Sequence, residues 1–115
     1  MINWKIPSKT KQAIITGNKI KIGNSSIVFT KESLKMVIGR FSNGKGIMIG
    51  IKDSILYLKD DKKGYKVNKH SSNYYNIMVS MPIIELLLEH GIKKGIYDLE
   101  SNGDGVFRCK FIEEI

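Results

Sequence analysis

The chain lacks the features that define several common classes of protein. Among its 115 residues Cys109 is the one cysteine, so no internal disulfide can form and a reducing, cytoplasmic setting is expected. The longest mostly apolar stretch, residues 76–88, is interrupted by Ser80, Pro82 and Glu85 and is shorter than the ~20 residues that a membrane-spanning helix needs. We therefore expect neither a disulfide-rich secreted domain nor a membrane protein.

Arginine is also scarce. Of 19 basic residues only Arg40 and Arg108 are arginine, and lysine lacks the planar fork that reads guanine or grips a phosphate with two hydrogen bonds. The net charge of +8 still favours an anionic partner such as a nucleic acid. A biased coding composition is an alternative explanation for the many lysines.

The charge is distributed unevenly along the chain. Residues 1–69 contain 15 Lys and Arg against four Asp and Glu, a net charge of +11, whereas residues 70–115 carry a net charge of −3. One domain whose halves differ in sign is polarised, with one face suited to an anion. The basic first half is therefore the expected binding half.

Hydrophobic periodicity predicts four strands and one helix in the first half. Residues 19–22 alternate polar and apolar, residues 27–29 form a second apolar run, and Thr30 is a good N-cap for a helix of about ten residues that Gly39 ends. Two more apolar runs, 47–51 and 55–58, predict a hairpin. The expected order is strand, strand, helix, strand, strand.

The second half repeats this order. A shift of 50 residues places Thr30 on Ser80, Leu34 on Ile84, and two further apolar helix positions on leucines. Pro82 suits a first helical turn, and the sequence Asn-Gly-Asp-Gly at residues 102–105 is a strong hairpin signal. Short strands and helices are common enough for chance to produce a similar order, but the matched cap, apolar stripe and stop favour a duplication.

These patterns predict an α+β, mostly β fold in which two tandem ββαββ units interleave into one β-barrel with a pseudo-two-fold axis and two short helices. Residues 1–16 would form an N-terminal arm, residues 17–64 the first unit and residues 65–115 the second. Neither unit can bury its apolar face alone, because a chain of about 45 residues buries too little surface to offset its conformational entropy. The two units are therefore expected to share one core.

The order of elements resembles that of the AbrB-type swapped-hairpin (SpoVT/AbrB-like) family of DNA-binding transcription regulators and antitoxins. The likeness covers about residues 17–115 and lies in the strand at 19–22, the turn, the strand at 27–29, the helix opened by Thr30 and the hairpin from Ile47 to Leu58. It implies a tandem pseudo-dimer that binds DNA. The chain also resembles uncharacterised small proteins of Gram-positive bacteria and their mobile elements.

This sequence departs from the AbrB pattern in front of the first helix. The family often has Gly-Arg followed by apolar residues and a proline there, whereas residues 23–26 lack the arginine and Thr30 stands near the place of the proline. The family's DNA-contact arginines are therefore not carried over.

Basic residues of the first half are the candidate nucleic-acid contacts. The glycine-rich loop 39–46 lacks the spacing of a nucleotide-binding loop but offers polar and basic donors, and lysines of the arm, the first strand and the connector at 62–69 could line a phosphate backbone. Trp4 and Phe41 could stack on bases, although apolar anchoring is the commoner role of single aromatics. The candidate residues are Lys9, Lys11, Lys19, Lys21, Arg40, Asn43, Lys45, Lys62, Lys63, Lys66 and Lys69.

No metal, cofactor or catalytic site is expected. Residues 98–104 match part of a calcium-loop pattern, but Cys109 stands where the bidentate carboxylate belongs, so a hairpin turn is the better interpretation. His70, His90 and Cys109 are too far apart in sequence to show the spacing of zinc ligands. No nucleophile, base and orienting group can be placed together, so an enzyme is not predicted.

Two functions remain open from the sequence. The first is a nucleic-acid-binding regulatory protein of a bacterium or mobile element, which contacts phosphates through its basic half. The alternative is a protein-interaction module, an inhibitor or accessory factor of a mobile element, with no nucleic-acid role. The oligomeric state is not indicated.

Overall fold

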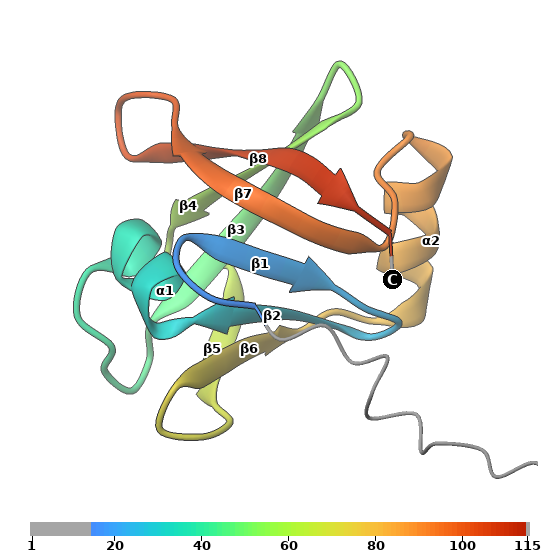
Figure 1. Ribbon diagram of the computed structural model, residues 1–115. Coiled ribbons are helices and arrows are strands. Elements are labelled where there is room, and N and C mark those ends of the chain that lie inside the picture. Colours follow the sequence, from blue (N-terminus) through green and yellow to red (C-terminus); the bar gives the residue numbers. More distant parts are fainter. Residues whose placement is uncertain (1–14, 115) are drawn as a thin grey trace, which may run out of the picture.

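The computed structural model describes residues 15–114, which form a closed antiparallel β-barrel of eight strands with two short helices (Figure 1). The predicted mostly β barrel with two short helices is confirmed. The strands are β1 (Lys19–Ile22), β2 (Ser26–Thr30), β3 (Gly46–Lys52), β4 (Ile55–Asp60), β5 (Tyr65–Lys69), β6 (Tyr74–Met78), β7 (Gly95–Ser101) and β8 (Val106–Glu113), and the helices are α1 (Lys31–Ile38) and α2 (Met81–Glu89).

The barrel closes through pairings that are distant in the chain. Its strand order is β1-β2-β6-β5-β3-β4-β8-β7, and β7 pairs with β1 to complete the ring. Hairpins form between neighbours in sequence, but β2 pairs with β6, β3 with β5, and β4 with β8. Within residues 15–114 each strand thus has two neighbours, although β3 pairs with β5 only through Gly46 and Ile47.

Alternating residues along each strand produce the core. In β1, Ile20 and Ile22 are fully buried while Lys19 and Lys21 point outward, as the period of two predicts. Opposite them Ile27 and Phe29 of β2 are also fully buried. The interior is one continuous apolar cluster, so both halves of the chain contribute to a single core.

The two helices lie at opposite sides of the barrel, with α1 on the left and α2 on the right of Figure 1. Helix α1 inserts Leu34, Val37 and Ile38 into the core, and α2 inserts Ile84 and Leu87. Helix α1 has eight residues rather than the predicted ten, because Gly39 leaves the helical conformation directly after Ile38. Among the residues that the structure describes, no helix is long and apolar enough to cross a membrane.

The turns follow their local sequence. Asp53 and Ser54 both have positive φ, 52° and 62°, which gives the tight two-residue connection between β3 and β4. Residues 102–105 connect β7 to β8, and their turn is closed by a hydrogen bond from Val106 N to Gly103 O at 3.0 Å. The predicted final hairpin is therefore present.

Candidate nucleic-acid interface

Helix α1 begins at a well-formed cap. The Thr30 hydroxyl accepts a hydrogen bond from Ser33 N at 2.9 Å, and the Ser33 hydroxyl accepts one from Thr30 N at 2.9 Å. Both residues are buried, and Lys31 N donates to Asn73 O in the β5–β6 turn at 3.1 Å. The start of α1, and with it Lys31, is therefore held firmly against the barrel.

Gly39 redirects the chain at the other end of α1. Its φ of 71° lies in the left-handed region, which glycine adopts without the steric cost that other residues have. The chain turns there, so that Arg40 and Phe41 lie beside the helix they follow. Phe41 packs on the buried Tyr75 of β6, with ring centroids 5.0 Å apart and planes inclined by 44°.

These elements enclose a hollow that we call the α1 hollow. It has a volume of about 520 Å3 and is lined by Lys31, Leu34, Lys35, Gly39, Arg40, Phe41 and Tyr75. Its lining is mainly apolar, with the two aromatic rings together on one side. Each charged side chain that lines it is a cation, so the hollow combines an apolar surface with a positive potential.

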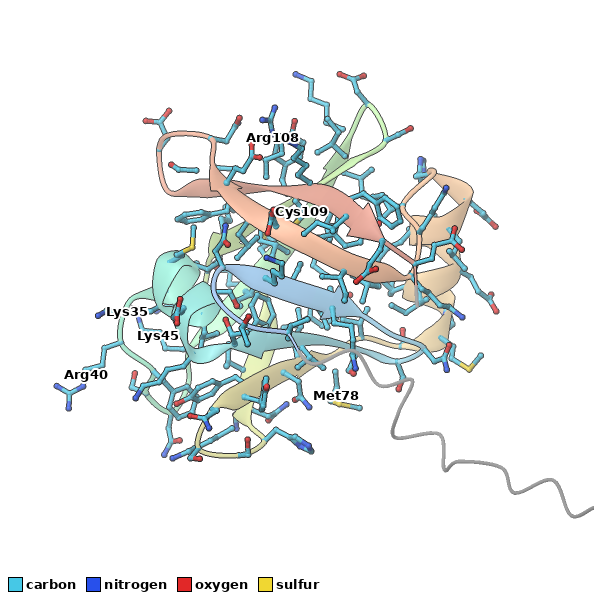
Figure 2. The ribbon with its side chains drawn as sticks, viewed as in Figure 1. Lys35, Arg40, Lys45, Met78, Arg108 and Cys109 are labelled. Atoms are coloured by element: carbon cyan, nitrogen blue, oxygen red, sulfur yellow. The ribbon has the colours of Figure 1, made fainter. Side chains whose placement is uncertain are left out.

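The three cations of the α1 hollow are exposed and available. Within residues 15–114, none of Lys31, Lys35 and Arg40 forms an ion pair. Glu32, which follows Lys31 in sequence, does not line the α1 hollow but lines a neighbouring depression that Lys31 also borders. Figure 2 shows Lys35 and Arg40 on the same side of the molecule, with Arg40 reaching outward.

Lys31 occupies a position that does not serve helix stability. It is the first residue of α1, where the positive end of the helix dipole disfavours a cation by about 0.3–1 kcal/mol. Lys35, in the last turn, is favourable to the same dipole and lies one turn from Lys31 on the same face. Helix stability therefore gives no reason for a cation at this position.

Of the residues predicted from sequence, Arg40 lies in the α1 hollow and three others meet in a neighbouring depression. Asn43, Lys45 and Lys62 line it together with Asp60 and Asp61. Lys45 Nζ lies 3.4 Å from Asp60 Oδ2, so the two carboxylates offset the two lysine charges there. This depression attracts anions less than the α1 hollow does.

The remaining predicted residues are spread over separate strands. Lys19 and Lys21 lie on β1, where Lys19 Nζ is 3.3 Å from Asp98 Oδ1. Lys66 and Lys69 lie on β5, and Lys63 in the turn before it. Strands β2 and β6 lie between these two groups of lysines, and their outward-facing residues are uncharged. Across the four strands, Lys21 of β1 pairs with Val28 of β2, which pairs with Asn76 of β6, which pairs with Asn68 of β5. Lys9, Lys11 and Trp4 lie outside the described residues.

The candidate residues predicted from sequence do not include Lys31, Lys35 and Tyr75, which line the α1 hollow. The spacing of Lys31 and Lys35 by one helical turn was a signal for a shared face. Tyr75 carried no such signal, because its contact with Phe41 depends on the pairing of β6 with β2 and β5.

The side chains most suited to metal binding or covalent chemistry have structural roles within residues 15–114. Among residues 15–114 no group of three or more His, Cys, Asp and Glu side chains is placed to hold a metal ion. Cys109 is only 5% exposed, and burial raises the pKa of its thiol far above the usual range. Residues 102–105 form a hairpin turn between two strands, without the helices that flank a calcium loop.

Comparison of the chain with protein-family models, with curated proteins and with solved structures finds no match in any of the three. The resemblance to the AbrB-type family therefore rests on the order of elements alone.

Proposed function

We propose that the protein binds nucleic acid through the α1 hollow, with Lys31, Lys35 and Arg40 contacting phosphates. The observation that carries this proposal is the grouping of three exposed cations without ion-pair partners among the described residues, around an apolar and aromatic surface. Phosphates attract such cations at long range, and the release of condensed counterions drives binding. A regulatory role in a bacterium or mobile element fits a small binding domain of this kind.

The distribution of charge between the two helices also favours the α1 end of the barrel as the binding side. Helix α1 and the loop after it carry Lys31, Lys35 and Arg40 with one acidic residue, Glu32. Helix α2 carries Glu85 and Glu89 and is followed by Lys93 and Lys94, so the charges there balance. An anionic chain should therefore approach the α1 side in preference to the α2 side.

Salt-dependent binding tests the proposal. Three phosphate contacts predict that raising the salt from about 50 to 200 mM weakens binding roughly 20-fold for a single strand and roughly 40-fold for a duplex. Fluorescence anisotropy with labelled oligonucleotides measures both the affinity and this slope. The triple variant Lys31→Ala, Lys35→Ala, Arg40→Ala should bind far more weakly at low salt and lose most of the slope.

A second triple variant controls for net charge. Lys52→Ala, Lys59→Ala, Lys110→Ala removes the same charge from strands β3, β4 and β8, at positions that do not line the α1 hollow. It should keep most of the affinity. Equal losses in the two variants would show a diffuse charge effect, and no binding of the wild-type chain to any oligonucleotide at low salt would refute the proposal.

We also infer that the barrel consists of two diverged ββαββ units, β1 to β4 with α1 and β5 to β8 with α2. Exchanging the two sets of strands leaves the circular strand order unchanged, which supports this interpretation. Gly46 and Gly95, at the starts of β3 and β7, both lack room for a Cβ atom. A chain in which a second copy of residues 15–64 replaces residues 65–114 should unfold cooperatively as a monomer, and failure to do so would count against the inference.

The second candidate function is a protein-interaction module that uses α2. Met81, Leu86 and Leu88 are each more than 40% exposed beside Glu85 and Glu89, which suits a protein surface with apolar and basic groups. A partner of this kind should still be captured from an extract treated with nuclease. The double variant Leu86→Ser, Leu88→Ser should fail to capture it. A captured protein that the double variant still binds would count against the α2 surface.

A further inference from the structure

We propose that the α1 hollow accepts an unpaired nucleobase, so that the protein prefers single-stranded nucleic acid to duplex. This inference rests on the proposed function and specifies the form of its ligand. It arises from the position of Phe41, whose ring lines the hollow among the three cations. An aromatic ring in this place adds nothing to the binding of a phosphate and offers a face for stacking.

The geometry of the hollow favours a base that has left its stack. Phe41 and Tyr75 form one side of a recess of about 520 Å3 between α1 and the segment that follows Gly39. In a duplex each base face is covered by its neighbours, and only edges are presented in the grooves. A recessed aromatic surface can therefore meet a base face only where the nucleic acid is single-stranded.

The packing of the two rings makes Phe41 a stable platform. Tyr75 is buried and its ring contacts Phe41 at a centroid distance of 5.0 Å, while Phe41 itself is only partly buried. Both rings line the hollow, and Phe41 also packs against the core of the barrel. Little side-chain freedom remains to be lost when a base stacks there.

The cations are placed to hold the backbone on either side of the base. Lys31 and Lys35 line the hollow from α1, and Arg40 lines it from the chain that follows the helix. A strand that crosses between them would place a phosphate near each side while its base enters the recess. The arrangement requires no particular base, so weak sequence preference is expected.

Binding of three probes of equal length tests the inference: a single-stranded 12-mer, its duplex, and a 12-mer in which all sites are abasic. The wild-type chain should bind the normal single strand about 10-fold more tightly than either of the other two, because one stacked base contributes about that factor. Phe41→Leu should lower binding of the normal strand to the level of the abasic strand and leave the salt slope unchanged. Phe41→Tyr should restore the preference.

Phe111→Leu is the matched control, since Phe111 is an exposed aromatic residue on β8 that packs on Tyr97 outside the α1 hollow. It should change none of the three affinities. If the wild-type chain binds duplex or abasic strand as tightly as the normal strand, the base-binding inference is wrong while the phosphate proposal stands. If Phe41→Leu has the unfolding stability of the wild type but still prefers the normal single strand, Phe41 is not the stacking surface. Binding of none of the probes would remove both proposals.

Discussion

Ile27 of β2 and Ile77 of β6 lie directly opposite each other, although fifty residues separate them in the chain. Both side chains are fully buried, and the pairs on either side are Ser26 with Met78 and Val28 with Asn76. If the halves are two related units, as we propose, these two residues occupy equivalent positions and the relating axis passes between them. This register supports the two-unit interpretation, and it shows where the halves join into one core.

Gly46 and Gly50 of β3 should respond in opposite ways to alanine. A Cβ atom on Gly46 would lie 2.6 Å from Asp61 O, in a turn whose Asp61 N donates to Gly46 O, so the β4–β5 turn would have to move. Gly46→Ala should therefore reduce the free energy of unfolding by roughly 1–3 kcal/mol. Gly50 has no atom within 4 Å of the Cβ position, so Gly50→Ala should be neutral or slightly stabilising. Urea unfolding of both variants makes the comparison, and equal effects would contradict it.

The N-caps of the two helices should also differ. Thr30→Ala removes the hydrogen bond to Ser33 N from a buried cap and should cost about 1–2 kcal/mol of unfolding free energy. Ser80 makes no side-chain hydrogen bond at the start of α2, so Ser80→Ala should change stability by less than about 0.5 kcal/mol. Thermal unfolding followed by circular dichroism distinguishes the two. A larger loss for Ser80→Ala would refute this assignment.

Tyr97 should make the protein less stable at high pH. The side chain is 4% exposed and donates a hydrogen bond to Lys93 O at 2.6 Å, and burial raises the pKa of its hydroxyl to about 12 from the usual value near 10. The folded state therefore keeps a proton that the unfolded state has lost between these pH values. This contribution is complete below pH 10 and is lost as the pH rises towards 12.

The variant Tyr97→Phe isolates this effect. At pH 9 it should be less stable than the wild type, because Lys93 O loses its donor, and the difference should shrink as the pH approaches 12. Absorbance at 295 nm should show a phase of tyrosine ionisation near pH 12 in the wild type that the variant lacks. A constant difference in stability across this range would contradict the prediction.

Cys109 should be unreactive in the folded protein. Its side chain belongs to the core of the barrel, and burial keeps the thiol protonated at neutral pH. Ellman's reagent should modify it only slowly without denaturant and rapidly in guanidinium chloride. Fast modification under native conditions would instead show that β8 separates readily from β7.

Local sequence was sufficient for the individual elements. The alternation in residues 19–22 predicts β1 because side chains of a strand point to opposite faces, and the apolar stripe from Leu34 to Ile38 predicts α1 because a helix repeats every 3.6 residues. Thr30 and the turn at 102–105 were recognised through chemistry that acts within a few residues. Such short-range signals are readable because both partners lie close together in the chain.

The candidate site was predictable only in part, for the same reason. Arg40 was expected as a phosphate contact, and Phe41 as a possible stacking residue, from the composition of their loop. Their combination with Lys31 and Lys35 depends on the direction in which the chain leaves Gly39. Where the lysines of β1 and β5 lie relative to each other also depends on the tertiary structure, which places β2 and β6 between these strands.

The sequence by itself determined the mostly β composition, the N-cap of α1, the hairpins and the excess of positive charge in the first half. The tertiary structure alone decided that β7 closes the barrel on β1, that Lys19 and Lys45 face carboxylates, and that Tyr75 packs against Phe41. These relationships join residues 15 to 79 positions apart, and they follow from burying one apolar surface completely within a closed ring. No local pattern encodes such a condition, because it is satisfied by the whole chain at once.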